Sequence, residues 1–369
     1  MSVSSSTAVA PADRRIVVES IGSAQPALAG VLAEQLGVAP DRIANAFYRA
    51  PAILFDALPA NQADGLANIL KQAGLAVRVE ASAAPRLEAE AVYDIAIYVE
   101  DVTALPACCE RLNTFLGHDP ATALKLLLAP TGVVLGNVSL ATCEALVKQF
   151  QDLPVQVMSS ERSQATYQLF IEREAGPLLD RLQEDLKQMG LPTQAGQTPL
   201  LDQQSAQQLW RRHQAGGGIR LFDCSFLRYD LSLTQTTASS RNEQLPLLAG
   251  LPRELIDTVL ANLPIVVEEG VCHAMLPQRL QAWQDADMPV QVSLASLRRC
   301  RVVIPSGNHL EPALPLLKQA GLLAVESSLP QLPWQSPVLL GELLPRWLQA
   351  GLEQLQITTT WEELNHEPQ

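Results

Sequence analysis

The chain has 369 residues, of which 47% are hydrophobic, and this length exceeds what one hydrophobic core usually supports, so we expect several domains. Its 39 acidic residues outnumber 26 Lys and Arg residues, and the net charge of -13 opposes a partner with a phosphate backbone. We therefore predict an acidic globular protein that binds no nucleic acid.

The chain starts with MSVSSSTAVAPADRR, which lacks the basic segment and apolar run of a secretory signal. No stretch approaches the roughly 18 apolar residues that a membrane-spanning helix requires, and no window gathers enough basic residues to attract anionic lipid. The six cysteines are widely spaced, which is typical of reduced thiols. We predict a cytoplasmic protein that binds no membrane, with residues 1–13 as a disordered arm.

From Ile16 the sequence alternates between strand-like and helix-like segments. Strand IVVES precedes helices PALAGVLAEQLG and APDRIANAFYRA, strand PAILFDAL, helix NQADGLANILKQAG and strand LAVRVEA. The predicted order is βααβαβ, and we assign it to residues 14–82 as module 1.

The same order recurs twice with similar clarity. Residues 91–160 form module 2, which starts with strand YDIAIYVED, and residues 221–295 form module 4, which starts with the segment RLFDCSFLRYDLSLT. The middle strands of the three modules begin at Pro51, Pro130 and Pro264, a position where a missing backbone donor is tolerated. The repeated proline supports the interpretation of these segments as repeats.

Two further segments fit this order less well. Residues 165–222, module 3, lack an obvious middle strand, and in residues 299–360, module 5, the second helix is shortened or lost. Polar linkers are expected at 81–92 and 159–165, with a tail at 361–369. The predicted fold class is α+β: tandem βααβαβ modules, each a three-stranded antiparallel sheet with helices on one face.

A short motif occurs three times in the chain. The hexapeptide LKQAGL occupies residues 70–75 and again 317–322, and LKQMGL occupies 186–191. In each copy Lys suits the last turn of a helix, Gly suits a left-handed cap, and the final Leu can contact the preceding turn. We predict that all three copies end helices, and that the copy at 186–191 has the same place in its module as the copy at 317–322.

Residues 16–80 resemble the C-terminal domain of the bacterial large-subunit ribosomal stalk protein. The resemblance rests on Gly22, on Ala50 with Pro51, and on the ending KQAGLAVRVE; the second half of module 4 resembles the same domain. A related fold serves the N-degron adaptor of the Clp protease. The resemblance implies protein-binding modules, and it implies an accessory role in translation or proteolysis as a lesser alternative.

In the stalk family, basic residues on the first helices recruit translational GTPases. The matching positions here hold uncharged residues, namely Gln25, Gly30, Ala33 and Ala44. The resemblance therefore implies protein binding without implying GTPase recruitment.

Few residue clusters suggest chemistry. The glycines of HQAGGGIR, residues 213–220, precede a strand rather than a helix N-terminus, which favours a loop over a phosphate site. Cys108 and Cys109 lack a second ligand pair for a tetrahedral metal site, and the five His residues are dispersed. We predict no metal, no cofactor and no catalytic residue. One alternative stays open, because Cys272 beside His273 could form a nucleophile pair near Glu268 and Glu269.

We therefore expect a non-catalytic, protein-binding scaffold or adaptor, whose partners are other proteins, including further copies of this chain. The alternative is an enzyme with a site at a module junction near Cys272 and His273. Aromatic residues often anchor interfaces, and the candidate protein-contact residues are Phe47, Tyr48, Trp283, Trp334 and Trp347. The segment 234–244 lies where other modules have a tight turn, and it is a candidate for a function particular to this protein.

Overall fold

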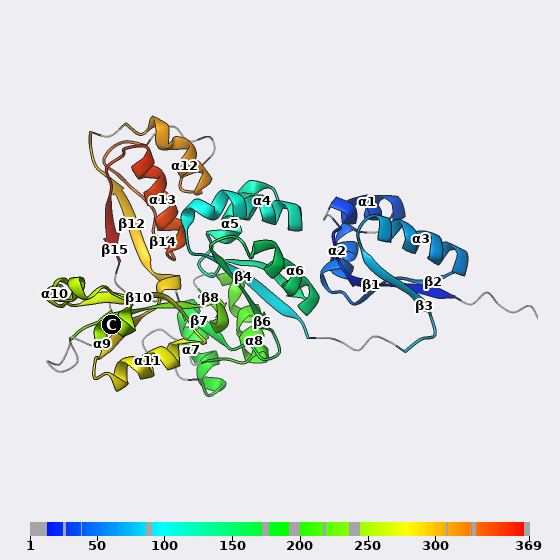
Figure 1. Ribbon diagram of the computed structural model, residues 1–369, viewed down its shortest axis with the longest axis horizontal. Coiled ribbons are helices and arrows are strands. Elements are labelled where there is room, and N and C mark those ends of the chain that lie inside the picture. Colours follow the sequence, from blue (N-terminus) through cyan, green and yellow to red (C-terminus); the bar gives the residue numbers. More distant parts are fainter. Residues whose placement is uncertain are drawn as a thin grey trace, which may run out of the picture. The chain divides into compact units, whose positions relative to one another are not determined.

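A computed structural model describes residues 13–24, 27–37, 39–85, 91–171, 177–191, 200–216, 219–235, 244–307, 309–324, 326 and 330–364. Within these residues, small antiparallel sheets follow one another along the chain, each with its own helices (Figure 1). The predicted α+β class is confirmed. The chain divides into two compact units. One comprises residues 1–95, 103–124 and 134–163, and the other comprises residues 96–102, 125–133 and 164–369. Module 2 contributes residues to both units.

Module 1 has the predicted order of elements. These are β1 (Arg14–Ser20), α1 (Ala27–Leu36), α2 (Pro40–Tyr48), β2 (Ala52–Leu58), α3 (Ala60–Gln72) and β3 (Ala76–Ala81). Strand β1 is central and pairs antiparallel with β2 and β3. Because strand side chains alternate between faces, Ile16 and Val18 enter a core that receives side chains from all three helices. The helices therefore cover one face of the sheet.

Module 2 repeats this order. Its elements are β4 (Tyr93–Val99), α4 (Leu105–Leu116), α5 (Pro120–Leu127), β5 (Val133–Val138), α6 (Leu140–Phe150) and β6 (Val155–Glu161). The sheet order is β5-β4-β6, so the first strand is again central. Strand β6 includes part of the predicted linker 159–165. Helix α6 begins after Ser139, whose hydroxyl accepts a hydrogen bond from the Thr142 amide and so satisfies one free donor of the first turn.

Module 3 is reduced. It contains β7 (Tyr167–Ile171), α7 (Pro177–Gln188), α8 (Gln203–His213) and β8 (Ile219–Asp223), with β7 paired to β8. In place of a middle strand, the described residues show one antiparallel bridge between Tyr167 and Leu201, with both backbone hydrogen bonds at 2.8 Å. The three-stranded prediction therefore does not extend to this module.

Module 4 has the three-stranded sheet β10-β9-β11. Its elements are β9 (Arg228–Leu233), α9 (Gln244–Ala249), α10 (Ile256–Ala261), β10 (Ile265–Cys272), α11 (Leu276–Asp285) and β11 (Val290–Ser293). The segment RLFDCSFLRYDLSLT, with which module 4 is predicted to start, contains two strands, because β8 ends at Asp223 and β9 begins at Arg228. The Asp223 carboxylate accepts a hydrogen bond from the Ser225 amide and starts a short 3-10 turn between them.

Module 5 differs from the prediction at two places. Its elements are β12 (Arg299–Ile304), α12 (Leu314–Gln319), β13 (Trp334–Gln335), β14 (Leu339–Leu340), α13 (Leu343–Gln354) and β15 (Thr360–Glu363). The middle strand is interrupted, because Ser336, Pro337 and Val338 separate β13 from β14 and proline cannot donate to the ladder. The last strand extends to Glu363, so the predicted tail begins too early; residues 365–369 lie outside the described residues.

The three hexapeptides end helices as predicted. In the first, the Leu75 amide donates to the Leu70 carbonyl and the Gly74 amide donates to the Lys71 carbonyl, both at 3.0 Å. This is the Schellman pattern, and the copies at 186–191 and 317–322 repeat it. The first copy ends α3 before the last strand of its module. The second copy ends α7, before the bridge at Leu201, and the third ends α12, before the interrupted middle strand of module 5. The prediction that these two copies occupy the same place in their modules is confirmed.

Modules 4 and 5 use the same helix ending without glycine. Asp287 has φ 55° and Gln356 has φ 58°, and both take the position of Gly74 at the end of the last helix. The residues after them, Met288 and Ile357, donate back to the carbonyls of Trp283 and Leu352. The backbone geometry therefore repeats where the residue type does not.

Candidate functional site

Cys272 and His273, the candidate nucleophile pair, lie at the end of β10. Of the six cysteines, all within the described residues, Cys272 is the only one that is not buried. The His273 Nδ1 atom lies 3.2 Å from the Tyr229 hydroxyl oxygen, and their ring centroids are 5.8 Å apart. Among the hydrogen bonds of the described residues, none joins His273 to the Cys272 sulfur. The imidazole is therefore held by a phenol rather than by the neighbouring thiol.

Glu268, the carboxylate predicted near this pair, makes structural contacts. Its two oxygens accept hydrogen bonds from Arg279 at 2.6 and 2.7 Å, and Trp283 Nε1 donates to the same carboxylate. Arg279 also donates to the Leu248 carbonyl at 2.9 Å. These bonds join β10 to α11 and to the end of α9. The carboxylate thus holds the module together.

The buried cysteines are poor nucleophiles at neutral pH. Burial raises the pKa of four thiols to about 11: Cys108, Cys109, Cys143 and Cys224. Burial also raises the pKa of Cys300. Because the thiolate is the reactive form, these side chains act as small apolar groups in the cores.

Two of the predicted protein-contact residues are inaccessible. Phe47 is 1% exposed in the core of module 1, and Trp283 is 0% exposed in the core of module 4. Phe47 lies one turn after Ile43, which is also buried, so both occupy the stripe of α2 that faces the sheet. Trp334 and Trp347 are partly buried against the core of module 5. Their rings mainly stabilise single modules.

Tyr48 lies where module 1 contacts module 2. Its backbone carbonyl accepts hydrogen bonds from the Ser139 amide and the Thr142 hydroxyl, each at 2.9 Å. Its own hydroxyl donates to the Phe115 carbonyl at 3.1 Å, and burial raises its pKa to about 12. Arg49 donates to the Asn137 carbonyl at 3.0 Å. The end of α2 therefore binds the start of α6 within the chain.

A polar cluster that the sequence analysis missed lies between β4 and β9. The Arg228 guanidinium carbon lies 4.3 Å from the centroid of the Tyr98 ring, and the side chain is almost fully buried. Arg228 also donates to the Gly270 carbonyl at 3.1 Å. Burial lowers the pKa of Arg228. Burial raises the pKa of Tyr98, and the negative charge of Glu342 raises it further.

Asp230 extends this cluster on the same face of β9. Its side chain is 1% exposed; one carboxylate oxygen accepts the Gly270 amide at 2.9 Å and the other accepts from Arg298. Module 2 repeats the arrangement: Asp94 accepts the Asn137 amide at 2.8 Å and lies 3.5 Å from Arg162. In both modules an Asp of the first strand binds the residue of the middle strand that has a left-handed conformation.

The alternation of charged residues in RYDLSL could have revealed this cluster. Leu231 and Leu233 point to the core of module 4, so Arg228, Asp230 and Ser232 must occupy the other face of the strand. Charged residues on a central strand require partners there, because a buried charge is costly without them. The sequence could not say which residues these partners are.

Several large apolar side chains remain at the surface. Leu247 on α9 is 83% exposed, the highest value among the large apolar residues that the structure describes. Further examples come from module 4 and from other modules; those at least 44% exposed are Val31, Ile69, Leu140, Val147, Leu200, Leu255 and Met275. Exposed apolar groups of this kind are available for contact with another protein.

Two absences within the described residues, and several residues that cannot be placed, complete the description of the site. Within the described residues no group of three or more His, Cys, Asp or Glu side chains could hold a metal ion, and none of the helices is long and apolar enough to cross a membrane. Gln25, most of the segment 234–244, two glycines of HQAGGGIR and the arm at 1–12 lie outside the described residues.

Comparison with family models, curated proteins and solved structures adds no identification. No family model matches the chain, and neither a curated protein nor a solved structure matches it. The assignment of function therefore rests on the residues described above.

Proposed function

We propose that this protein is a non-catalytic, cytoplasmic scaffold or adaptor that binds other proteins, including further copies of itself, through several modules. The observation that carries this proposal is the exposure of Leu247, at 83%, together with exposed apolar side chains on other modules, such as Ile69 on α3 at 58%. Each site is small. Tandem sites can nevertheless give useful avidity, because the second contact of one partner is intramolecular.

The contacts of the ionisable side chains also support a non-catalytic role. Glu268 is bound by Arg279 and Trp283, and Asp230 is bound by Arg298. A general base needs a free position within reach of a substrate proton. These carboxylates instead fasten one element to another.

The test compares two variants with the intact chain. Leu247→Glu and Ile69→Glu each place a charge at an exposed site, so both variants should fold, as circular dichroism can verify. Affinity capture from the native cell with quantitative mass spectrometry should show that the two variants lose different proteins. Light scattering should reveal whether copies of the chain are among the partners. An identical set of captured proteins from all three chains would contradict the scaffold proposal.

A second candidate function rests on Cys272. This cysteine is the least buried of the six, it lies opposite Arg228 in the ladder, and the adjacent His273 is held by Tyr229. An enzyme that used this thiol should be alkylated by iodoacetamide at Cys272 first, with loss of a small-molecule activity. Cys272→Ser would abolish such an activity, whereas Cys300→Ser would preserve it. Capture of proteins that is unchanged by Cys272→Ser would favour the scaffold.

A further inference from the structure

The sheet of module 1 has a second face, opposite its helices, which we call the open face. Residues that pair across neighbouring strands share a face, so the ladder places Val17, Ile53 and Arg78 together, and likewise Arg15 and Glu80. None of these five side chains belongs to the core of module 1. The open face is therefore a band of charges around two apolar residues.

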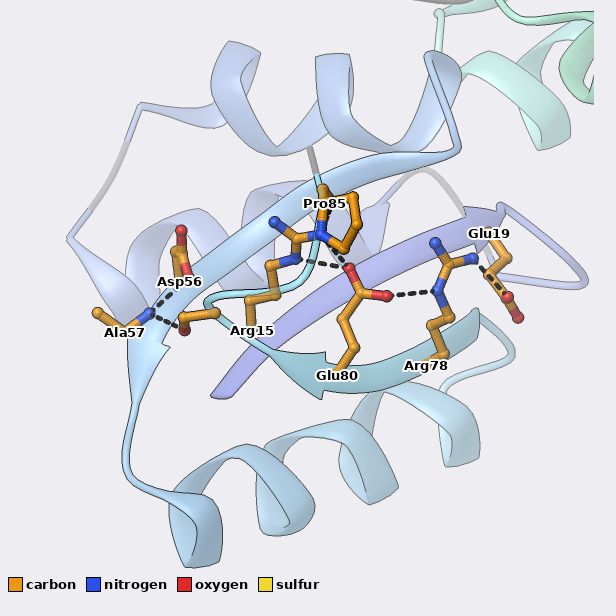
Figure 2. A network of polar contacts seen from close by, with 8 residues as sticks. Arg15, Glu19, Asp56, Ala57, Arg78, Glu80 and Pro85 are labelled. Atoms are coloured by element: carbon orange, nitrogen blue, oxygen red, sulfur yellow. Dashed lines mark hydrogen bonds and ion pairs between the residues drawn. The ribbon is translucent and has the colours of Figure 1, made fainter. Parts of the chain in front are cut away.

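The chain folds back onto the open face directly after β3. The Ser82 amide donates to the Asp13 carbonyl at 3.0 Å, and the Ser82 hydroxyl accepts from the Ala57 amide at 3.3 Å. Arg15 then donates to the Pro85 carbonyl at 2.5 Å, and Figure 2 shows Pro85 beside the guanidinium. Residues 82–85, which we call the strap, are thus fastened at both ends.

Arg15 is the central contact of this arrangement. It is 2% exposed, and its other partner is Glu80, at 2.5 Å from Nε. Glu80 in turn accepts from Arg78, which also binds Glu19, so a row of alternating charges links β1 and β3 (Figure 2). A buried guanidinium requires such partners, because its desolvation is costly. The strap carbonyl therefore supplies part of what keeps Arg15 buried.

Exposure differs across the open face. Val17 is 0% exposed, whereas Ile53 is 38% exposed. The side chains of Arg78 and Glu19 are 39% and 47% exposed. Arg15 and Val17 in the middle of the central strand are therefore covered, whereas Glu19 near its end and the residues on the flanking strands are open to solvent.

We propose that residues 82–85 are a releasable strap that closes the centre of the open face, with Arg15 as its latch. Release would uncover the Arg15 guanidinium and open the centre of the face to solvent. It would also free four residues of chain after β3, which can span at most about 14 Å. This conformational device concerns module 1 alone, and it holds or fails independently of the proposed scaffold function.

Hydrogen exchange of the full-length chain tests the latch. Arg15→Met removes the bond to Pro85, whereas Arg78→Met is a matched control on the same face that leaves this bond in place. The Ser82 and Ala84 amides, which donate to Asp13 and Ala81, should exchange at least tenfold faster in R15M than in R78M or the unaltered chain. The amides of β1 should stay protected in all three chains, which shows that module 1 remains folded. Equal exchange at Ser82 and Ala84 in R15M and R78M would overturn the proposal.

A second measurement tests the cover directly. A cysteine introduced by Val17→Cys, followed by peptide-level mass spectrometry of alkylation, reports access to the centre of the open face. The thiol should be alkylated slowly in V17C and at least tenfold faster in V17C combined with R15M. V17C combined with R78M should behave like V17C alone. Fast alkylation of V17C without R15M would show that the strap does not close this face.

Discussion

The guanidinium carbon of Arg228 lies 4.3 Å from the centroid of the Tyr98 ring, and this contact joins the first strands of modules 2 and 4. Neither residue belongs to a recognisable motif. Both lie on strand faces turned away from the helices of their modules, where an unpaired charge would be costly. The pair thus joins β4 to β9 within one compact unit, to which both residues belong.

The aromatic ring of Tyr98 should contribute to the free energy of unfolding through its contact with Arg228. Tyr98→Phe removes the hydroxyl near Glu342 and keeps the ring, whereas Tyr98→Leu removes both. A desolvated cation–π contact contributes on the order of 2 kcal/mol, so Y98L should be less stable than Y98F by about that amount. Thermal unfolding followed by circular dichroism measures the difference. Equal stability of the two variants would show that the ring does not stabilise Arg228.

Gly270 should be intolerant of any side chain. It has φ 63°, and a Cβ built on it would lie 2.5 Å from the Tyr98 hydroxyl oxygen. Gly250 has φ 65° with no atom near its Cβ position, so it is a matched control for backbone strain alone. Gly250→Ala should cost about 1 kcal/mol, and Gly270→Ala should cost more because the Tyr98 contact must also move. A smaller cost for G270A than for G250A in denaturant unfolding would contradict this account.

The last helices of modules 4 and 5 should be stabilised by glycine at their ends. Gln356 and Asp287 have the left-handed conformation that Gly74 has in module 1. Gln356→Gly should stabilise the chain by roughly 0.5–1 kcal/mol, and Asp287→Gly by less, because Asp tolerates this conformation better than Gln. Gly74→Ala should destabilise it, since the new Cβ would approach the Ala24 amide at 2.8 Å. Melting temperatures in the order Q356G, D287G, unaltered chain, G74A are expected; a lower melting temperature for Q356G would contradict the explanation.

The ion pair of Arg111 with Asp152 should give a defined pH dependence. The hydrogen bond from Arg111 lowers the pKa of Asp152 to about 2, from an ordinary value of 3.8. Because the pKa is lowered on folding, the stabilising effect is complete above about pH 4 and is lost as the pH falls through 2. The stability difference between the unaltered chain and Arg111→Met should therefore be constant from pH 7 to 5, decrease as the pH falls through 2, and vanish only at about pH 1.

The carboxyl titration of the same variant provides the control. The pKa of Asp119 is lowered mainly by hydrogen bonds from Thr122 and not by Arg111, so it should be unchanged in R111M. The carbon-detected NMR titration of Asp152 should move to the ordinary range. A titration of Asp152 that is the same in both chains would rule out Arg111 as the cause.

Local patterns determine most of the secondary structure, and the sequence alone reveals them. The LKQAGL copies predict helix ends because a Schellman cap depends on a few adjacent residues, and Gly74 with Leu75 supplies them. The alternation of residues in β1 and β9 predicts one core face in each. Module boundaries are harder to place from the sequence: the segment from Arg220 contains two strands, because a short turn around Ser225 separates β8 from β9.

Only the tertiary structure decided which of the candidate contact residues are buried, and which residues contact the charged side chains. Phe47 and Trp283 were predicted to contact other proteins, yet each lies in a module core, because helix orientation rather than residue type sets the exposure of a ring. Arg228 meets Tyr98, and Arg15 meets Pro85, across long intervals of sequence. Strands and helices leave a sequence pattern with a period of two or about 3.6 residues, whereas contacts between distant residues leave no periodic pattern. They depend on how whole elements pack, and this is why the partners in the polar cluster and the strap are known only from the folded chain.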